Sequence, residues 1–213
     1  VSHLNLQPDR LRASFEASCS RMNVERIDLY FIHWPRADLD IRPTLDVMSE
    51  LRAAGRIGAI GVSNFAIDDV LSADDHCGVD MVQPPYNVFW RQIEGEYLAQ
   101  CEQRSIGVLT YSALALGLLA QSLPPRDALA PEPRLDTVLF QPDAYERCRT
   151  ATELLSSEAA RLGRSLPSLA VGRLVAEPGV TSVLVGCRSI DEFDDVLDGA
   201  ATPLGPDTIE RID

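Results

Sequence analysis

IDLYFIHWP at residues 27–35 and IGAIGVSNF at residues 57–65 decide the fold of this chain. Each segment is an apolar run of strand length that ends in polar side chains, His33 in the first and Ser63 with Asn64 in the second. A helical pattern precedes each run. In a chain that repeats strand and helix, the strands lie parallel, and the residues at their C-terminal ends come out on one face. The functional site is therefore expected on that face.

The composition predicts a globular protein. Of the 213 residues, 46% are hydrophobic, which is enough to bury a full core. The formal charge is -13, and all 19 basic residues are arginine. Such acidity argues against binding to nucleic acid or to an anionic membrane surface. Neither is therefore expected as a partner.

The cysteines argue for a reducing compartment. They are scattered, they form no CxxC pair, and no His-rich cluster stands at metal-ligand spacing. Reduced thiols and no metal site are expected at the five positions Cys19, Cys77, Cys101, Cys148 and Cys187. No stretch approaches the roughly 20 apolar residues of a membrane span, and the N-terminus lacks a basic segment followed by an apolar one. A cytoplasmic protein is the expectation.

Strands and helices alternate along the whole chain. The apolar pattern predicts strands at 27–33, 57–62, 79–82, 106–111 and 181–185. It predicts helices at 8–22, 44–54, 66–73, 93–104, 142–162, 165–176 and 189–197, with a further turn at 206–212. The proline-rich segment 123–141 lacks periodicity and is predicted to be a long surface loop on the functional face. No compositional break marks a linker, so a single α/β domain over residues 1–213 is predicted.

Four segments together resemble the aldo-keto reductase superfamily. They are RASFEASCSRMNVERIDLYFIHWP (12–35), LRAAGRIGAIGVSNF (51–65), MVQPPYNVFWRQIEGEYLAQCEQRSIGVLTYSALALGLL (81–119) and VTSVLVGCRSIDEF (180–193), in the order and at the spacing of that family. The resemblance implies a (β/α)8 TIM barrel and an NADP-dependent oxidoreductase. The implied reaction is hydride transfer between NAD(P)H and a small-molecule carbonyl or alcohol.

The resemblance also implies roles for residues at the strand ends. His33 matches the family's active-site histidine, which orients the substrate carbonyl and stabilises charge that develops on its oxygen. The groups that hydrogen-bond the nicotinamide carboxamide are matched by Ser63, Asn64 and Gln83. Tyr111 matches the aromatic residue that stacks on the nicotinamide ring.

Further along the chain, the resemblance implies the rest of the cofactor site. Ser112 and Leu114 match residues near the pyrophosphate, and the segment from Gly186 to Glu192 matches the one that binds the adenosine 2′-phosphate. Within that segment Arg188 is the residue that could contact a phosphate.

Purely structural interpretations stay open at these positions. A histidine at a strand end can be a satisfied hydrogen-bonding residue, as His33 would then be. Ser63 and Asn64 could cap the helix that starts near Ala66, since both residue types cap helices well. Tyr111 could pack at the mouth of a barrel.

The chain departs from the family at the proton donor. The family uses a tyrosine whose proton affinity is lowered by a lysine paired to an aspartate, on the first three strands and the loops after them. This sequence starts at what would be the family's third helix, and it contains no lysine. Neither Tyr30, in mid-strand, nor Tyr86, within QPPYN, matches the motif of the catalytic tyrosine. The resemblance thus implies the C-terminal part of the barrel, with little or no turnover by the isolated chain.

A second departure concerns the choice of cofactor. Glu192 stands where the family has glutamine or arginine, and Val196 stands where it has asparagine. A carboxylate close to a 2′-phosphate costs about 1 kcal/mol of binding energy or more through like-charge repulsion. NADP is the expected cofactor by resemblance, while Glu192 would suit NAD by accepting a hydrogen bond from a free ribose hydroxyl.

Five predicted strands are too few to close a barrel of eight. Three explanations stay open: a C-terminal portion of a longer protein, a short form completed by another chain, or a degenerate relative that acts as a non-catalytic binding or scaffolding protein. Open sheet edges would also allow self-association. A different chemistry, with His33 as general base in an elimination or isomerisation, is a further alternative. The identity of the substrate is not set by these residues.

Overall fold

The computed structural model describes residues 6–36, 38–121, 123–129 and 133–213. The chain divides into two compact units: unit 1 is Val1–Pro84 with Gly95–Leu109, and unit 2 is Pro85–Glu94 with Thr110–Asp213. The expectation of a single domain over residues 1–213 stays a prediction.

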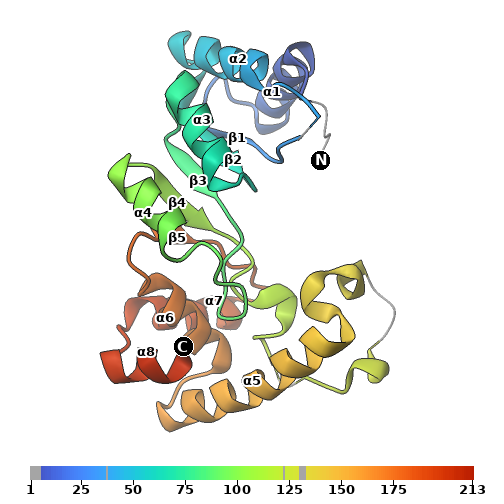
Figure 1. Cartoon of the computed structure of the whole chain (residues 1–213), viewed down its shortest axis with the longest axis vertical. Coiled ribbons are helices and arrows are strands. Elements are labelled where there is room, and N and C mark those ends of the chain that lie inside the picture. The colour runs from blue at the N-terminus through green and yellow to red at the C-terminus, as the bar shows by residue number, and fades with distance from the viewer. Residues whose placement is uncertain (1–5, 37, 122, 130–132) are drawn as a thin grey trace. The chain divides into compact units, whose positions relative to one another are not determined.

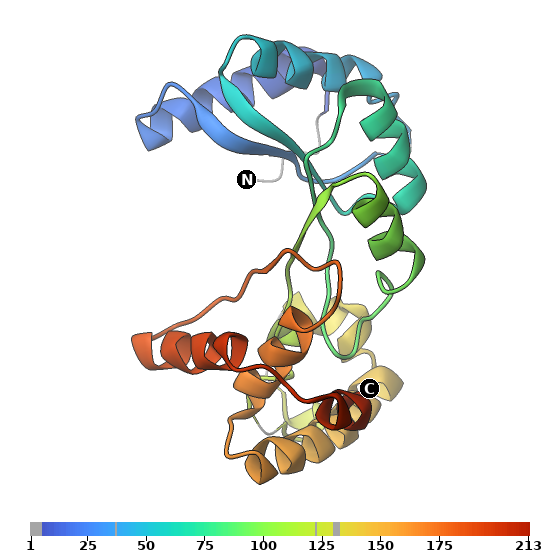
Figure 2. The same cartoon turned by 90° about the vertical axis from the view of Figure 1, so that its left-hand side faces the viewer.

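Unit 1 alternates helix and strand (Figure 1). Its elements are α1 (Pro8–Met22), β1 (Ile27–Ile32), α2 (Arg42–Ala53), β2 (Ile57–Ser63), α3 (Ile67–Cys77), β3 (Met81–Gln83), α4 (Glu96–Gln103) and most of β4 (Gly107–Thr110). The strands pair in parallel, with Ile27 opposite Ile57, Gly61 opposite Met81, and Met81 opposite Gly107. Figure 2 shows α1 and α2 on one side of β1 and β2. Phe15 of α1 and Met48 of α2 are fully buried there.

The register of β1 and β2 explains a glycine in the second deciding segment. Phe31 pairs with Gly61, and a Cβ on Gly61 would lie 2.4 Å from the Phe31 ring. No side chain fits at that distance, so the bulky ring and the glycine require each other. The neighbouring Tyr30 ring stands edge-on to the Phe15 ring, with 5.4 Å between the ring centroids. This edge-to-face contact stabilises the packing of α1 against the sheet.

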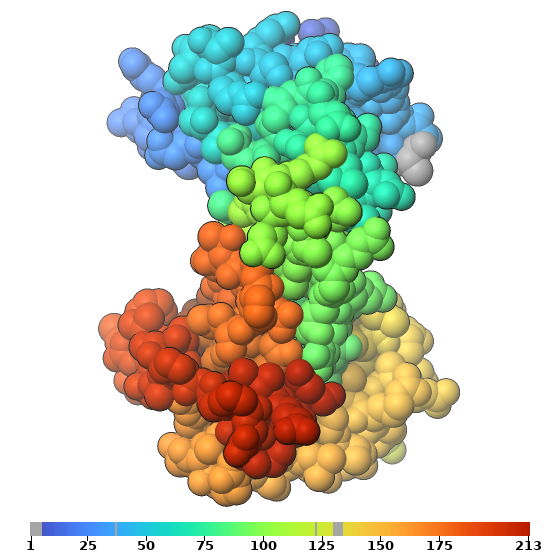
Figure 3. Space-filling model, turned by 60° about the vertical axis from the view of Figure 1, so that its left-hand side comes forward, coloured from blue at the N-terminus to red at the C-terminus, as the bar shows by residue number. Residues whose placement is uncertain are grey.

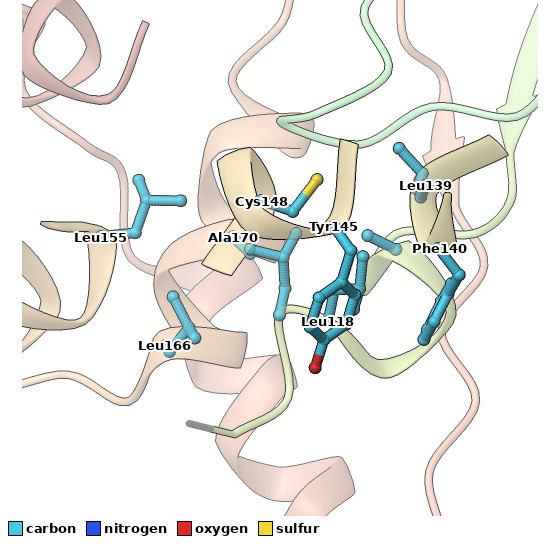
Figure 4. Packing of buried hydrophobic residues seen from close by; sticks show 10 residues of the cluster. Leu118, Leu139, Phe140, Tyr145, Cys148, Leu155, Leu166 and Ala170 are labelled. Carbon is cyan, nitrogen blue, oxygen red and sulfur yellow. The ribbon is translucent and has the colours of Figure 1, made fainter. Parts of the chain in front are cut away.

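Unit 2 is built on α5 (Pro142–Arg161), α6 (Leu166–Val175), α7 (Ile190–Ala201) and α8 (Pro206–Ile212), with the short strand β5 (Ser182–Val183). Its core packs side chains of α5 and α6 against the segments before α5 (Figure 4). Tyr145 is fully buried in this cluster, and its hydroxyl donates a hydrogen bond to the Pro124 carbonyl at 2.9 Å. Figure 3 shows α8 at the surface of unit 2 near α5, where the Arg211 guanidinium lies 2.9 Å from the Glu158 carboxylate.

The strands are hydrogen-bonded in chain order, β1-β2-β3-β4-β5. At the last step the Leu184 N–H donates to the carbonyl of Thr110 at 2.8 Å. The α/β class with about five strands and flanking helices is confirmed. Of the helices in the described ranges, none combines the length and the apolar character that a bilayer crossing requires.

Several sequence predictions need correction. Helix α3 ends at Cys77 rather than at residue 73, and α7 ends at Ala201 rather than at residue 197. Helix α2 begins at Arg42 rather than Thr44, because Pro43 suits the first turn of a helix. Helix α4 begins at Glu96 rather than Ile93, because Gly95 has a φ of 79° that no helix accommodates. The segment 123–141 is no simple surface loop.

Within that segment lie the short 3-10 helices η2 (Arg126–Ala128), η3 (Pro133–Asp136) and η4 (Val138–Phe140). Leu139 and Phe140 are buried in the unit 2 core. The Arg134 guanidinium stands over the Phe140 ring at 5.4 Å. The apolar residues at the end of the segment thus bury it in the core, although its prolines are typical of a surface loop. Residues 130–132 of the predicted loop lie outside the described residues.

Candidate functional site

The ends of β1, β2 and β3 bring four of the predicted site residues together in unit 1. The Asn64 side-chain amide donates to the His33 carbonyl at 2.9 Å and to the Ser63 hydroxyl oxygen at 3.1 Å. The Ser63 hydroxyl in turn donates to the Gln83 carbonyl at 2.9 Å, and the Asn64 N–H donates to the same carbonyl at 3.2 Å. Parallel pairing places Ser63 opposite Gln83, so their proximity follows from the register.

These bonds give Ser63 a use other than capping the helix that follows. The residue before α3 is Ala66, whose side chain makes no capping hydrogen bond. Ser63 is buried and joins strand to strand instead. Asn64 has a φ of 64°, a left-handed conformation that asparagine tolerates better than most residues. The two residues therefore shape the strand ends.

His33 presents its side chain outward. The residue is exposed, and its imidazole has no hydrogen-bond partner among the described residues. The ring centroid lies 6.1 Å from that of Trp34. The main-chain carbonyl of His33 is the acceptor for the Asn64 side chain. The geometry leaves the imidazole able to meet a ligand, and it does not support a histidine satisfied by the protein itself.

Unit 2 holds the predicted residues that follow β4. The Tyr111 carbonyl accepts from the N–H of Tyr86 at 2.9 Å, and burial raises the pKa of the Tyr111 phenol. Ser112 comes next with a φ of 64°. Ala115 and Leu116 also have positive φ, at 49° and 58°. Strained backbone of this kind collects at ligand-binding sites, since surrounding structure must hold it in place.

A cavity of about 350 Å³ opens beside this turn within unit 2. Its wall contains four predicted residues, Leu114, Gly186, Arg188 and Glu192. Sequence reasoning missed other polar residues of the wall, which are Gln121, Arg134 and Asp195. They carried no signal in the sequence, because they stand in the irregular segment before α5 and on the polar face of α7.

Arg188 and Glu192 form a pair at the start of α7. The Glu192 carboxylate accepts from the Arg188 N–H at 2.7 Å and from its guanidinium at 2.8 Å. The Ser189 hydroxyl oxygen accepts from the Glu192 N–H at 3.1 Å. This exchange closely resembles a capping box, which satisfies the orphan donors of a helix start. The bonds from Arg188 lower the pKa of Glu192, and the bond to Glu192 raises the pKa of Arg188.

The residues present fit a nucleotide phosphate. Two guanidinium groups, those of Arg134 and Arg188, stand on the cavity wall. A Cβ on Gly186 would meet no atom within 4 Å, so the backbone there is open to close approach. Guanidinium donors and exposed backbone suit the geometry of phosphate oxygens. In unit 1, amide and hydroxyl groups at strand ends suit a carboxamide.

Known proteins resemble this chain over nearly its whole length. The model of the aldo/keto reductase family matches residues 2–213. Aldo-keto reductase YhdN of Bacillus subtilis is 34% identical over 181 residues, which cover 84% of this chain and 55% of that protein. The NADH-specific methylglyoxal reductase of Escherichia coli is 29% identical over 191 residues, covering 88% of this chain and 58% of that protein.

A solved structure agrees with the fold. That of a glycerol dehydrogenase from Gluconobacter oxydans superimposes with a TM-score of 0.87 at 30% identity, covering 98% of this chain and 64% of that one. The chain thus spans between about half and two thirds of the length of these relatives. The predicted fold class, part of a barrel of this type, is confirmed.

Proposed function

The chain belongs to the aldo/keto reductase family, and on that premise we propose that it carries the cofactor side of an oxidoreductase site. A nicotinamide cofactor supplies hydride exchange with a small-molecule carbonyl or alcohol there. The observation that carries the proposal is the hydrogen-bonded set of strand ends in unit 1, which joins His33, Ser63, Asn64 and Gln83. These are polar groups fixed in place before any ligand arrives, which is what orientation of a reacting ring requires.

Each residue of the set has a proposed task. The amide and hydroxyl groups of Ser63, Asn64 and Gln83 bind the carboxamide and fix which face of the ring is presented. The exposed His33 imidazole donates a hydrogen bond to the substrate oxygen, which favours the negative charge that develops on it. In unit 2, Tyr111 supports the ring, and Ser112 with Leu114 meets the pyrophosphate.

The cavity in unit 2 is the proposed place for the adenosine phosphate end. Gly186 and Arg188 hold the phosphate, and NADP is the proposed cofactor. NAD is the alternative, supported by the Glu192 carboxylate on the cavity wall and by the relative whose name is NADH-specific methylglyoxal reductase. The Glu192 carboxylate would repel a 2′-phosphate bound in this cavity, so Glu192 weakens the preference for NADP over NAD.

Cofactor binding tests this proposal directly. Asn64→Gly keeps the left-handed backbone and removes the amide. Asn23→Gly is the matched control, because Asn23 has a φ of 53° at the end of α1. We expect NADPH to bind about tenfold more weakly to the Asn64 variant, the loss of roughly one good hydrogen bond. Unchanged affinity in both variants would remove Asn64 from the site.

We further propose that the 213-residue chain by itself turns over no carbonyl. It contains no lysine that could lower the proton affinity of a tyrosine acting as the acid. Burial raises the pKa of every tyrosine it has, namely Tyr30, Tyr86, Tyr97, Tyr111 and Tyr145. None of these phenols is prepared to release a proton near neutral pH. Carbonyl-dependent oxidation of NADPH by the purified chain would contradict this.

The same observation on the tyrosines keeps a second function open, that of a non-catalytic binding or scaffolding protein. The two functions differ in a simple measurement, saturable binding of NADPH or NADH by the natural protein, whose absence favours the second. A cytoplasmic location and self-association through the outer edges of β1 and β5 complete the proposal. Sedimentation at several concentrations tests the association.

A further inference from the structure

Asn87, in the QPPYN segment, is a fully buried polar residue with two defined partners. Its side-chain oxygen accepts from the Phe89 N–H at 2.9 Å, and its amide nitrogen donates to the Ser112 carbonyl at 3.2 Å. The orientation of the amide follows from chemistry, because a backbone N–H can only donate and a carbonyl can only accept. Asn87 therefore connects its own loop to Ser112, 25 residues later in the chain.

Ser112 is the residue in this pair that needs support. Its φ of 64° is unfavourable for a residue with a Cβ. The Ser112 carbonyl receives a second hydrogen bond from the Ala115 N–H at 2.8 Å. The two donors together stabilise a turn whose backbone conformation is unfavourable for serine.

The segment around Asn87 is itself rigid. The Tyr86 N–H donates to the Tyr111 carbonyl, and Pro85 forms a parallel bridge with Tyr111. The buried Tyr86 hydroxyl donates to the Glu94 carboxylate at 2.6 Å. Residues 85–87 thus lie along Tyr111 and Ser112 and are joined to them by hydrogen bonds, of which that of Asn87 is the last.

We propose that Asn87 is a positioning residue for the cofactor. It holds the Ser112 carbonyl and so fixes the turn that presents Tyr111 and Leu114. The proposal rests on the function proposed above, since those residues are assigned there to the nicotinamide ring and the pyrophosphate. Asn87 itself touches no ligand in this assignment.

Two variants of the natural protein test this role. Asn87→Asp keeps the acceptor for Phe89 and removes the donor to Ser112, while Asn87→Ala removes both. Asn23→Asp, the same chemical change at an exposed position in unit 1, is the control. Affinities are measured for NADPH and NADH, and for their adenosine ends alone, 2′,5′-ADP and 5′-AMP. Under the proposed function the adenosine ends bind in the cavity at Gly186, so their affinity reports whether unit 2 is still folded.

We expect both Asn87 variants to bind the dinucleotide about tenfold more weakly and the adenosine end within about twofold of the parent. Equal losses for dinucleotide and adenosine end, or no loss in either, overturn the role of Asn87. If the parent protein binds the dinucleotide no more tightly than its adenosine end, the proposed function itself fails, and the role of Asn87 fails with it. The control is expected to match the parent.

Discussion

Arg173→Leu is expected to destabilise unit 2 by about 3 kcal/mol, at the lower end of what removing one member of a buried ion pair costs. The Arg173 side chain is 4% exposed. Its guanidinium lies 2.7 Å from the Asp213 carboxylate, 2.8 Å from that of Glu177 and 3.7 Å from that of Glu94. Leucine leaves these carboxylates partly buried without their shared cation.

The lower end of the range applies because two of the carboxylates keep another cation. Arg91 lies 2.7 Å from Glu94 and 2.9 Å from Asp213. Glu177, at 17% exposure, has no such replacement among the described residues. Most of the expected loss is therefore the burial of one unpaired carboxylate, together with the lost hydrogen bonds to Asp213.

The two tryptophans allow the effect to be read in unit 2. Trp34 belongs to unit 1 and Trp90 to unit 2, so Trp34→Phe leaves a single reporter in the unit of interest. Urea unfolding followed by Trp90 fluorescence gives the free energy. Arg149→Leu is the control, since Arg149 pairs with Glu146 and Glu153 on the surface of α5, and its loss should change the free energy of unfolding little.

The pH dependence gives an independent check. The bonds from Arg173 lower the pKa of Asp213, and for Glu94 the bonds from Arg91 and Tyr86 outweigh the burial that raises its pKa. A carboxylate with a lowered pKa in the folded state contributes stability above its unfolded value, and loses it as the pH falls. The difference between parent and Arg173→Leu should be full above about pH 5 and should shrink below about pH 4. A difference below about 1 kcal/mol at pH 7, or one independent of pH, refutes the reasoning.

Two further predictions concern α7. Glu192→Gln keeps one side-chain acceptor for Arg188 and removes the charge, so the ratio of NADPH to NADH affinity should rise about fivefold as the like-charge repulsion is lost; Glu153→Gln, the same change at an exposed, ion-paired glutamate of α5, should leave that ratio unchanged. Gly199→Ala should lower stability by about 1–3 kcal/mol, because its Cβ would lie 2.4 Å from the Ser168 carbonyl oxygen. Gly205→Ala, where a Cβ would meet no atom within 4 Å, should be neutral in the same denaturation experiment.

Sequence periodicity predicted the elements well where local chemistry decides. The bounds of α1 were correct, and Asn23 ends that helix in the left-handed conformation, which asparagine tolerates well. Periodicity failed at α4, where Ile93 is buried at the right spacing but Gly95 turns the chain before the helix starts. Burial and helical conformation are separate properties, and the pattern of apolar residues reports only the first.

The same distinction applies to the candidate site: the grouping of its residues was predictable, and their contacts were not. His33, Ser63, Asn64 and Gln83 could be grouped from the sequence, because parallel pairing brings consecutive strand ends together. Their hydrogen bonds could not be predicted, since capping of α3 was an alternative local use of Ser63 and Asn64. Contacts across long loops, such as that of Asn87 with Ser112, leave no periodic trace in a single sequence.

Both units place a left-handed residue where a strand passes into its loop, although the hydrogen bond at that residue runs in opposite directions: Asn64 donates with its own side chain, and Ser112 accepts with its carbonyl. Asn64 follows β2 and Ser112 follows β4 and Tyr111, each with a φ of 64°. In each case an asparagine amide donates to a main-chain carbonyl from a distant segment, Asn64 to His33 and Asn87 to Ser112. A turn whose residues have negative φ would not need such a hydrogen bond. A residue in the left-handed region costs free energy of order 1 kcal/mol or more. Asn64 and Ser112 are two of the non-glycine residues with positive φ in the described part of the chain, and both belong to the proposed cofactor site. A fixed direction of the backbone at these two positions is the gain that we propose in return for that cost.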